Sequence, residues 1–353
     1  MDGSFLEDAA IRLAESGHVP DRIVRIAIRR MCARRLQEDV PADPEEAIAR
    51  TEAFLAQMRS ASIAPGPDHP NDQHYEVPAA FFRLVLGRHL KYSCGYWPEG
   101  VTSLDDAETE ALQRTAEHAA LADGQRILEL GCGWGSLTLF MAETFRDARI
   151  TAVSNSRSQR EHIEAAARSR GLGNVEVITA DMNDFAPEGR FDRIVSVEMF
   201  EHMRNYEALL SRVAKWLEPQ GRLFVHVFCN RAVPYAFSTD GASNWMGRHF
   251  FTGGMMPSDD LLLRCASPLR PLRQWRWPGT HYQKTAEAWL ANLDAQRAKV
   301  HEVMTRTYGD TDARRWQQRW RMFFMACAEL FGFDAGRQWW VSHYLLGRDA
   351  GAP

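Results

Sequence analysis

The stretch that decides the fold is Glu129 to Gly135, which reads Glu-Leu-Gly-Cys-Gly-Trp-Gly. It closes the apolar run Arg126 to Leu130, typical of a buried strand, and it precedes a helical pattern at residues 136–145. Glycines at alternate positions let the backbone turn tightly and let a ligand approach without an intervening side chain. The third glycine comes one position earlier than in the Gly-x-Gly-x-x-Gly dinucleotide fingerprint. The turn alone is a weak signal that differs from a dinucleotide site, and a turn used only for packing is the alternative to a ligand site.

Strands and helices alternate around this turn, from residue 104 to residue 230. Further strands are predicted at 149–153, 175–179, 194–197 and 222–227, and further helices at 157–170 and 206–217. This alternation predicts an α/β fold with a parallel sheet, helices on both faces and right-handed crossovers. Sheets of this kind bind ligands at the carboxyl ends of their strands.

The segments that flank this core have a different pattern. Residues 1–73 predict a helical N-terminal segment and a proline-rich linker, and residues 74–353 are expected to form the main domain. Within that domain, residues 231–335 predict an irregular, aromatic-rich insert for the acceptor pocket, followed by helices at about 284–306 and 312–331. Residues 338–347 predict a strand that returns to the sheet.

Composition excludes several classes of protein. The 353 residues are 45% hydrophobic and carry 42 basic and 46 acidic side chains, so the net charge of −4 gives no field for nucleic-acid binding. The six cysteines form no CxxC pair, so neither a disulfide framework nor a metal site is indicated. The N-terminus lacks an export signal, and no apolar run is long enough to span a bilayer. We therefore expect a cytoplasmic protein without a transmembrane segment.

The first helical segment is basic. Against the single acid Asp21 it carries six arginines, namely Arg22, Arg25, Arg29, Arg30, Arg34 and Arg35. A solvated or ion-pairing helix face is one interpretation, and a peripheral contact with an anionic membrane surface is the other.

The Gly-x-Gly-x-Gly spacing after an acid resembles motif I of the S-adenosyl-L-methionine (SAM)-dependent methyltransferases. That resemblance implies the class I fold, which is Rossmann-like with a seven-stranded, mostly parallel sheet, and implies SAM as cofactor and S-adenosyl-L-homocysteine as product. The cofactor-binding residues it predicts at the turn are Glu129, Gly131, Gly133 and Gly135. After the second strand, where many such enzymes place an acid for the ribose, this chain has the polar residues Ser154, Asn155 and Gln159. Asp181 and Met182 after the third strand fit an adenine site, with a turn cap as the alternative role of Asp181.

Three further segments narrow the resemblance. They are Lys91 to Trp97 (Lys-Tyr-Ser-Cys-Gly-Tyr-Trp), Val197 to Met203 (Val-Glu-Met-Phe-Glu-His-Met) and His281-Tyr282. With the glycine-rich turn, these segments resemble the cyclopropane-fatty-acyl-phospholipid synthase superfamily. Within it, the likeness is greater to the plant tetrahydroisoquinoline (coclaurine-type) N-methyltransferases, and it runs almost from end to end. The resemblance adds Tyr92 and Ser93 to the predicted cofactor site.

The N-methyltransferase resemblance implies that Glu198, Glu201 and His202 face a substrate amine. A secondary aliphatic amine resembles lysine, with a pKa of about 10.4, so its nucleophilic form lies about 4.6 kcal/mol uphill at pH 7. An enzyme must therefore bind the ammonium and accept its proton. Carboxylates suit the first task, and a carboxylate or a histidine suits the second.

The lipid branch of the superfamily methylates an alkene in an acyl chain and uses a bound bicarbonate. The residues that match its bicarbonate site are Cys94, Glu201, His226 and Tyr282. All four are present, although the plant N-methyltransferases generally have glutamate at the position of His226. The predicted acceptor is a small amine, with a lipid acyl chain as the alternative and with bicarbonate as an additional ligand in that case.

Glu198 favours the amine, because a second carboxylate suits a cation and not a neutral alkene. The aromatic insert also supplies Trp245, Phe250 and Phe251, which could stack on an aryl amine. A binding module without catalysis is a further alternative, but the glycines and Glu201 are retained. The sequence is compatible with a homodimer.

Overall fold

The structure is a computed structural model that describes residues 3–65, 77–241 and 244–348. Its centre is a seven-stranded sheet in the order β3-β2-β1-β4-β5-β9-β8. The strands are β1 (Arg126–Leu130), β2 (Arg149–Ser154), β3 (Val175–Thr179), β4 (Phe191–Val197), β5 (Leu217–Asn230), β8 (Leu269–Trp277) and β9 (Trp339–Arg348). The first five pair in parallel, whereas β9 and β8 are antiparallel. The predicted seven-stranded, mostly parallel α/β fold is confirmed.

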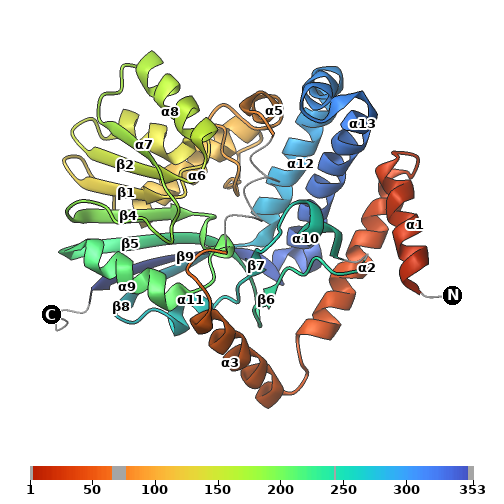
Figure 1. The fold of residues 1–353 in the computed structure, drawn as a ribbon, viewed down its shortest axis with the longest axis horizontal. Coiled ribbons are helices and arrows are strands. Elements are labelled where there is room, and N and C mark those ends of the chain that lie inside the picture. The colour runs from red at the N-terminus through yellow and green to blue at the C-terminus, as the bar shows by residue number, and fades with distance from the viewer. Residues whose placement is uncertain (1–2, 66–76, 242–243, 349–353) are drawn as a thin grey trace.

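Helices cover both faces of this sheet (Figure 1). One face packs against α6 (Leu104–His118), α7 (Ser136–Thr144) and α8 (Arg157–Ser169) through a buried aliphatic cluster. The other face packs against α9 (Tyr206–Trp216) and α3 (Pro44–Ser60). Because both faces are covered, the parallel strands read as continuous apolar runs, which is why the sequence located them.

A helical lobe stands beside the sheet (Figure 1). It contains α1 (Gly3–Glu15), α2 (Asp21–Asp39), α5 (Ala79–Val85), α12 (Gly279–Ala295) and α13 (Arg297–Gly332), followed by the short 3-10 helix η3 (Phe333–Gly336). Its core is aromatic and includes Phe81, Trp289 and Trp320, all nearly inaccessible to solvent.

The predicted helices of this lobe differ in their bounds from the observed ones. The first ends at Ala295 and not near residue 306, and Gln296 separates α12 from α13 at a break that the sequence did not predict. The predicted gap between 306 and 312 contains Gly309, whose φ of 77° interrupts the helical geometry inside α13. The break near residue 309 was therefore predicted, whereas the break at Gln296 was not.

The insert after β5 is more ordered than the sequence indicated. It forms a two-stranded sheet of β6 (Tyr235–Ala236) and β7 (Met255–Met256), the helices α10 (Trp245–His249) and α11 (Leu261–Arg264), and strand β8. The expectation of an irregular insert was wrong at β8. That strand is mostly exposed, carries three arginines and contains Pro271, features that a strand tolerates only at the edge of a sheet.

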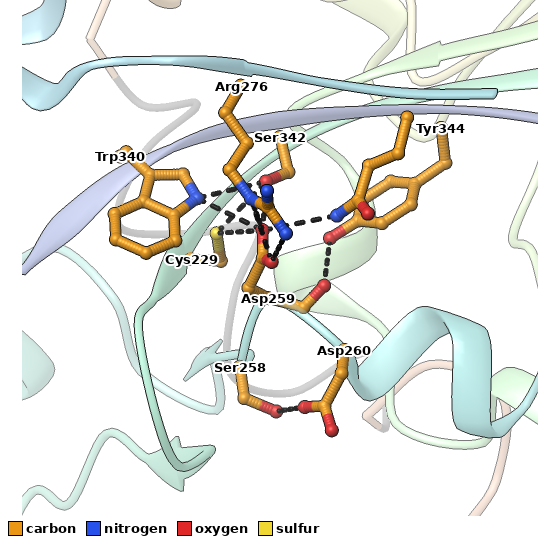
Figure 2. A network of polar contacts seen from close by, with 9 residues as sticks. Cys229, Ser258, Asp259, Asp260, Arg276, Trp340, Ser342 and Tyr344 are labelled. Carbon is orange, nitrogen blue, oxygen red and sulfur yellow. Dashed lines mark hydrogen bonds and ion pairs between the residues drawn. The ribbon is translucent and has the colours of Figure 1, made fainter.

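Asp259 attaches this insert to the sheet through a buried polar network (Figure 2). Its carboxylate accepts hydrogen bonds from Arg276 of β8 and from Trp340 and Ser342 of β9. Its backbone carbonyl accepts a hydrogen bond from the Tyr344 hydroxyl at 2.5 Å. These contacts lower the pKa of Asp259 despite the opposing effect of burial. The network therefore fixes the segment around Asp259 against β8 and β9.

The basic helix predicted at the N-terminus is α2, and its arginines form ion pairs within the protein. Arg25 bridges Glu287 of α12 and Glu329 of α13, at 2.6 and 2.9 Å, and Arg29 also pairs with Glu329. The ion-pairing interpretation of this helix face is therefore confirmed for these two arginines. Within the described part of the chain, no helix is long and apolar enough to cross a membrane. Most of the predicted linker, and the domain boundary placed at residue 73, lie outside the described residues.

Candidate active site

The glycine-rich turn joins β1 to α7, and two of its glycines are required for different reasons. Gly131 has a φ of +80°, and a Cβ there would lie 2.8 Å from the Cβ of Met199. Gly133 has a φ of +50°, and a Cβ there would meet no atom within 4 Å. Gly133 instead faces a cavity, so its lack of a side chain leaves that space open to a ligand.

A cavity of about 740 Å³ runs from this turn to the N-terminal helices. Nearly all of the sequence-predicted residues line it, and the structure therefore brings the two predicted sites together. The cofactor set on its wall comprises Tyr92, Ser93, Glu129, Gly131, Gly133, Ser154, Asn155, Gln159, Asp181 and Met182. The catalytic set comprises Glu198, Glu201, His202 and Tyr282. Gly135, Cys94 and His226 do not line the cavity.

The cofactor end of the cavity has the chemistry that SAM requires. Ser154 donates a hydrogen bond to Gln159 at 2.6 Å, which fixes two polar groups after β2. Asp181 accepts one from the backbone N–H of Asn183 at 2.7 Å, so it caps its turn and also lines the cavity. Burial raises the pKa of Glu129 to about 8, although Thr138 donates a hydrogen bond to it. A cationic ligand would compensate this buried carboxyl group, and SAM carries two cationic groups.

Glu198 follows β4 and has a φ of +48°, which is rare for a residue with a side chain. Its Oε1 accepts a hydrogen bond from the backbone N–H of Cys94 at 2.9 Å, and its Oε2 accepts one from the Tyr282 hydroxyl at 2.6 Å. His226 Nε2 lies 3.2 Å from Oε1. A non-glycine residue keeps a strained left-handed backbone conformation only where its surroundings hold it in place. At Glu198, the contacts of the side chain with Cys94, Tyr282 and His226 do so.

Buried charges near Glu198 decide its ionisation. Burial raises its pKa, and the positive charge of Lys91 and the hydrogen bond from Tyr282 lower it. Lys91 is itself buried and donates to Ser93 Oγ at 2.5 Å and to the carbonyl of Cys94 at 2.8 Å. Lys91 belongs to the segment Lys91 to Trp97, whose family resemblance implies roles for Tyr92, Ser93 and Cys94 but none for Lys91. The signal for Lys91 was a lysine directly next to those residues in the sequence.

Glu201 and His202 lie on the 3-10 helix η1 (Phe200–His202), directly after Glu198. The Glu201 side chain is buried, and its Oε2 has no hydrogen-bond partner among the described residues. Burial and the charge of Glu198 raise the pKa of Glu201 well above its usual range. Burial lowers the pKa of His202 to about 4, so its imidazole is neutral at pH 7. A carboxyl group with an open oxygen and a neutral imidazole thus face one cavity.

Next to these groups the wall of the cavity is mostly apolar and aromatic, and it includes Trp134, Trp245, Phe251 and Trp289. At the N-terminal helices the lining also contains charged residues, which are Glu7, Arg30, Arg34, Arg35 and Glu38. Phe251 stacks on His202 with ring centroids 5.9 Å apart. Phe250, grouped with Trp245 and Phe251 from the sequence, packs instead on Phe323 and does not line the cavity.

The strand order, the glycine-rich turn and the cavity at the carboxyl ends of the parallel strands define a class I SAM-dependent methyltransferase. Residues 68–337 match the family model described as mycolic acid cyclopropane synthetase, and the chain belongs to that family. The enzyme uses SAM as its cofactor.

Among the proteins that resemble the chain are two relatives and one solved structure. It is 36% identical to (S)-coclaurine N-methyltransferase of Thalictrum flavum subsp. glaucum over 95% of this chain and 94% of that protein. The crystal structure of coclaurine N-methyltransferase bound to N-methylheliamine and SAH superposes with a TM-score of 0.92, at 35% identity, over 96% of this chain and 99% of that one. Cyclopropane-fatty-acyl-phospholipid synthase of Escherichia coli is 29% identical over 73% of this chain and 63% of its own length.

Proposed function

We propose that the protein transfers the methyl group of SAM to the nitrogen of a small aliphatic amine that carries an aromatic ring. One observation carries this proposal. The carboxylate of Glu198 accepts hydrogen bonds from Cys94 and Tyr282 and contacts His226. By resemblance, these are groups with which the lipid branch holds bicarbonate. In this protein the Glu198 carboxylate bonds to these groups itself. It also places a negative charge where a substrate ammonium could bind.

The amine reaches the enzyme as an ammonium ion, because its pKa is about 10.4. Glu198 and Glu201 are both buried and each acts on the charge of the other, so they titrate as a pair. This pair binds the ammonium and accepts one proton, which frees the nitrogen lone pair. SAM, when bound, supplies a methyl group on a positively charged sulfur. The neutral imidazole of His202 stands beside the pair as a second hydrogen-bond acceptor.

The aromatic wall supports a substrate with an aryl ring. Trp245 and Phe251 line the cavity, and a cation held over the face of an aromatic ring gains about 0.5 to 2 kcal/mol. Similarity along the whole chain to proteins named coclaurine N-methyltransferase supports the same class of substrate.

Methyl or methylene transfer to an unsaturated acyl chain with bound bicarbonate is the alternative. His226 favours it, and so does the similarity to the Escherichia coli synthase. It has less support, because His226 does not line the cavity and contacts the Glu198 carboxylate instead.

Methyl-labelled SAM tests the two acceptors directly. The purified protein is offered a phenethylamine or a benzylisoquinoline in one reaction and vesicles of unsaturated phospholipid in another, each with and without bicarbonate. We expect label in the amine alone, at a rate independent of bicarbonate. Label confined to the lipid, or a rate that depends on bicarbonate, would overturn the proposal.

Glu198→Gln removes the charge beside the ammonium and keeps the size of the side chain. We expect kcat/KM for the amine to fall about 100-fold or more, while SAM affinity measured by calorimetry is retained. Glu188→Gln is the matched control, because Glu188 is exposed and distant from the cavity lining. Equal activity of the two variants would remove Glu198 from the substrate site.

A cytoplasmic location is also a proposal. It is supported by the six cysteines, Cys32, Cys94, Cys132, Cys229, Cys265 and Cys327, all of which are unpaired thiols. Fusion of the full chain to a fluorescent protein would test it by fractionation and microscopy.

A further inference from the structure

Two buried histidines lie next to each other in the sheet, behind the catalytic carboxylate. His226 of β5 and His343 of β9 are cross-strand partners, and Trp275 of β8 is the next partner of His343. Side chains of cross-strand partners on one face lie close enough to contact. His118, the last residue of α6, stacks on Trp275 with centroids 4.0 Å apart and an angle of 6° between the rings.

These rings form a continuous chain of hydrogen bonds. His226 Nε2 lies 3.2 Å from Glu198 Oε1, and His226 Nδ1 lies 2.9 Å from His343 Nε2. His343 Nδ1 in turn lies 2.8 Å from His118 Nδ1. His226 and His343 are fully buried, whereas His118 is partly exposed to solvent. The chain therefore connects a carboxylate of the cavity with the surface at the end of α6.

We propose that His226, His343 and His118 form a proton relay that carries the proton of the substrate ammonium from Glu198 to solvent. The proposal rests on the proposed function, because amine methylation creates the proton that must leave. A secondary ammonium and SAM give a tertiary ammonium, S-adenosyl-L-homocysteine and one free proton in each turnover. That proton is lost from nitrogen before the methyl group arrives, since the lone pair must be free.

Proton balance can be written along the chain. With Glu198 ionised, His226 and His343 carry their protons on Nε2 and His118 carries its proton on Nδ1. With Glu198 protonated, all three rings satisfy the same bonds with protons on Nδ1 of His226 and His343 and on Nε2 of His118. The second state becomes the first when each proton moves along its own hydrogen bond and His118 Nε2 releases one to solvent. The ring tautomers then reset before the next turnover.

A relay of this kind requires neutral rings, because a neutral imidazole has one donor and one acceptor. Burial lowers the pKa of His118 to about 4 and those of His226 and His343 well below their usual range. The charged groups around the relay are Glu198 and Lys91 at its inner end and Arg114, Glu117 and Arg273 at its outer end. Burial, reinforced by the positive charges of Lys91, Arg114 and Arg273, keeps the three rings uncharged, so each ring can accept a proton on one nitrogen and donate one from the other.

The test uses two variants of the outermost ring, which can be changed without opening the sheet. His118→Gln keeps an N–H donor for His343 and cannot relay a proton, and His118→Ala leaves space for a small added base. We expect kcat for the amine to fall about tenfold in both, with a larger solvent deuterium isotope effect than in the wild type. His89→Ala is the matched control, because His89 is also half-buried and bonded to Thr109 but lies outside the cavity and the relay.

Chemical rescue separates proton transfer from structure. Added imidazole should restore kcat of His118→Ala, whereas pyrazole, which has the same size but is too weakly basic to carry a proton at neutral pH, should not. Unchanged kcat in both His118 variants, or equal rescue by pyrazole, would overturn the relay while leaving amine methylation intact. The wild-type assay comes first, and a wild type that does not methylate amines would overturn the proposed function and the relay together.

Discussion

Two buried acidic centres of this protein are alike in position and opposite in chemistry. Asp259 follows β7 and Glu201 follows β4, and each lies beside the central sheet. The carboxylate of Asp259 is paired with Arg276 and receives further hydrogen bonds, and its pKa is lowered (Figure 2). Glu201 has an oxygen without a partner among the described residues, and its pKa is raised.

The presence or absence of a bonded partner among the described residues distinguishes a structural carboxylate, Asp259, from a proposed functional one, Glu201. A buried carboxylate that is fully paired holds segments together and has no capacity left for a ligand. A buried carboxylate that lacks a cation makes the free protein less stable and is stabilised by a cation that arrives with the substrate. Replacing each carboxylate by the corresponding amide removes its charge and tests this contrast. The substitution with the larger expected effect is described first.

Glu201→Gln has the largest expected effect on activity. Glutamine keeps the size of the side chain but cannot accept the ammonium proton, so we expect kcat for the amine to fall about 10²- to 10⁴-fold. Product formation from labelled SAM measures the loss, and calorimetry with SAM is the control for an intact cofactor site. Retention of more than a tenth of the wild-type rate would contradict the role of Glu201.

The same variant should be more stable than the wild type at neutral and alkaline pH. The folded-state pKa of Glu201 is raised, so the unfolded chain ionises first, at about pH 4.3, and stability falls as the pH rises above that value until the folded-state group ionises too. Glutamine removes this loss. Urea unfolding at several pH values should therefore show a gain that disappears in acid. A stability gain that grew toward acid pH would contradict a raised pKa of Glu201.

Asp259→Asn should reverse this pattern. The variant loses the charge that pairs with Arg276, and we expect about 2 kcal/mol less stability at neutral pH with kcat unchanged in the folded fraction. The folded-state pKa of Asp259 is lowered, so its contribution is complete above about pH 3.9 and is lost as the pH falls through the folded-state value. The difference from the wild type should therefore shrink in acid.

Asp260→Asn is the control for that measurement. Asp260 is the next residue, is more exposed and pairs with Arg264 within α11, so its loss should change stability by less than about 0.5 kcal/mol. Equal losses in Asp259→Asn and Asp260→Asn would mean that the buried network does not anchor the insert.

The sheet was largely predictable from the sequence, because the parallel strands are short apolar runs between turn residues and helices. Strand β8 was not, since an edge strand needs little burial and its arginines and Pro271 resemble a loop. The break at Gln296 was missed for a related reason. The residues around it are compatible with a helix, so the sequence carries no signal for the end of α12 at this position.

The candidate site was predictable as a set of residues and not as a geometry. Motif resemblance identified Glu198, Glu201 and His202. These three residues are close together in the sequence and also in space. The histidine chain could not be found in this way, because His343 lies 117 residues from His226 and 225 residues from His118. Those contacts depend on the register of β5 with β9, which a single sequence does not specify.

The smallest predictions each remove one hydroxyl, either beside Glu198, which titrates as a pair with Glu201, or beside Asp259. Tyr282→Phe deletes a donor to Glu198, and Ser342→Ala deletes a donor to Asp259, so each should lose about 1 kcal/mol of stability. Only Tyr282→Phe should alter catalysis. The Tyr282 hydroxyl lowers the pKa of Glu198, so without it that pKa rises and the acid limb of kcat/KM moves to higher pH. If Ser342→Ala shifted the pH profile of kcat/KM as far as Tyr282→Phe does, the two centres would be coupled. The distinction between an anchoring carboxylate and a catalytic one would then be wrong.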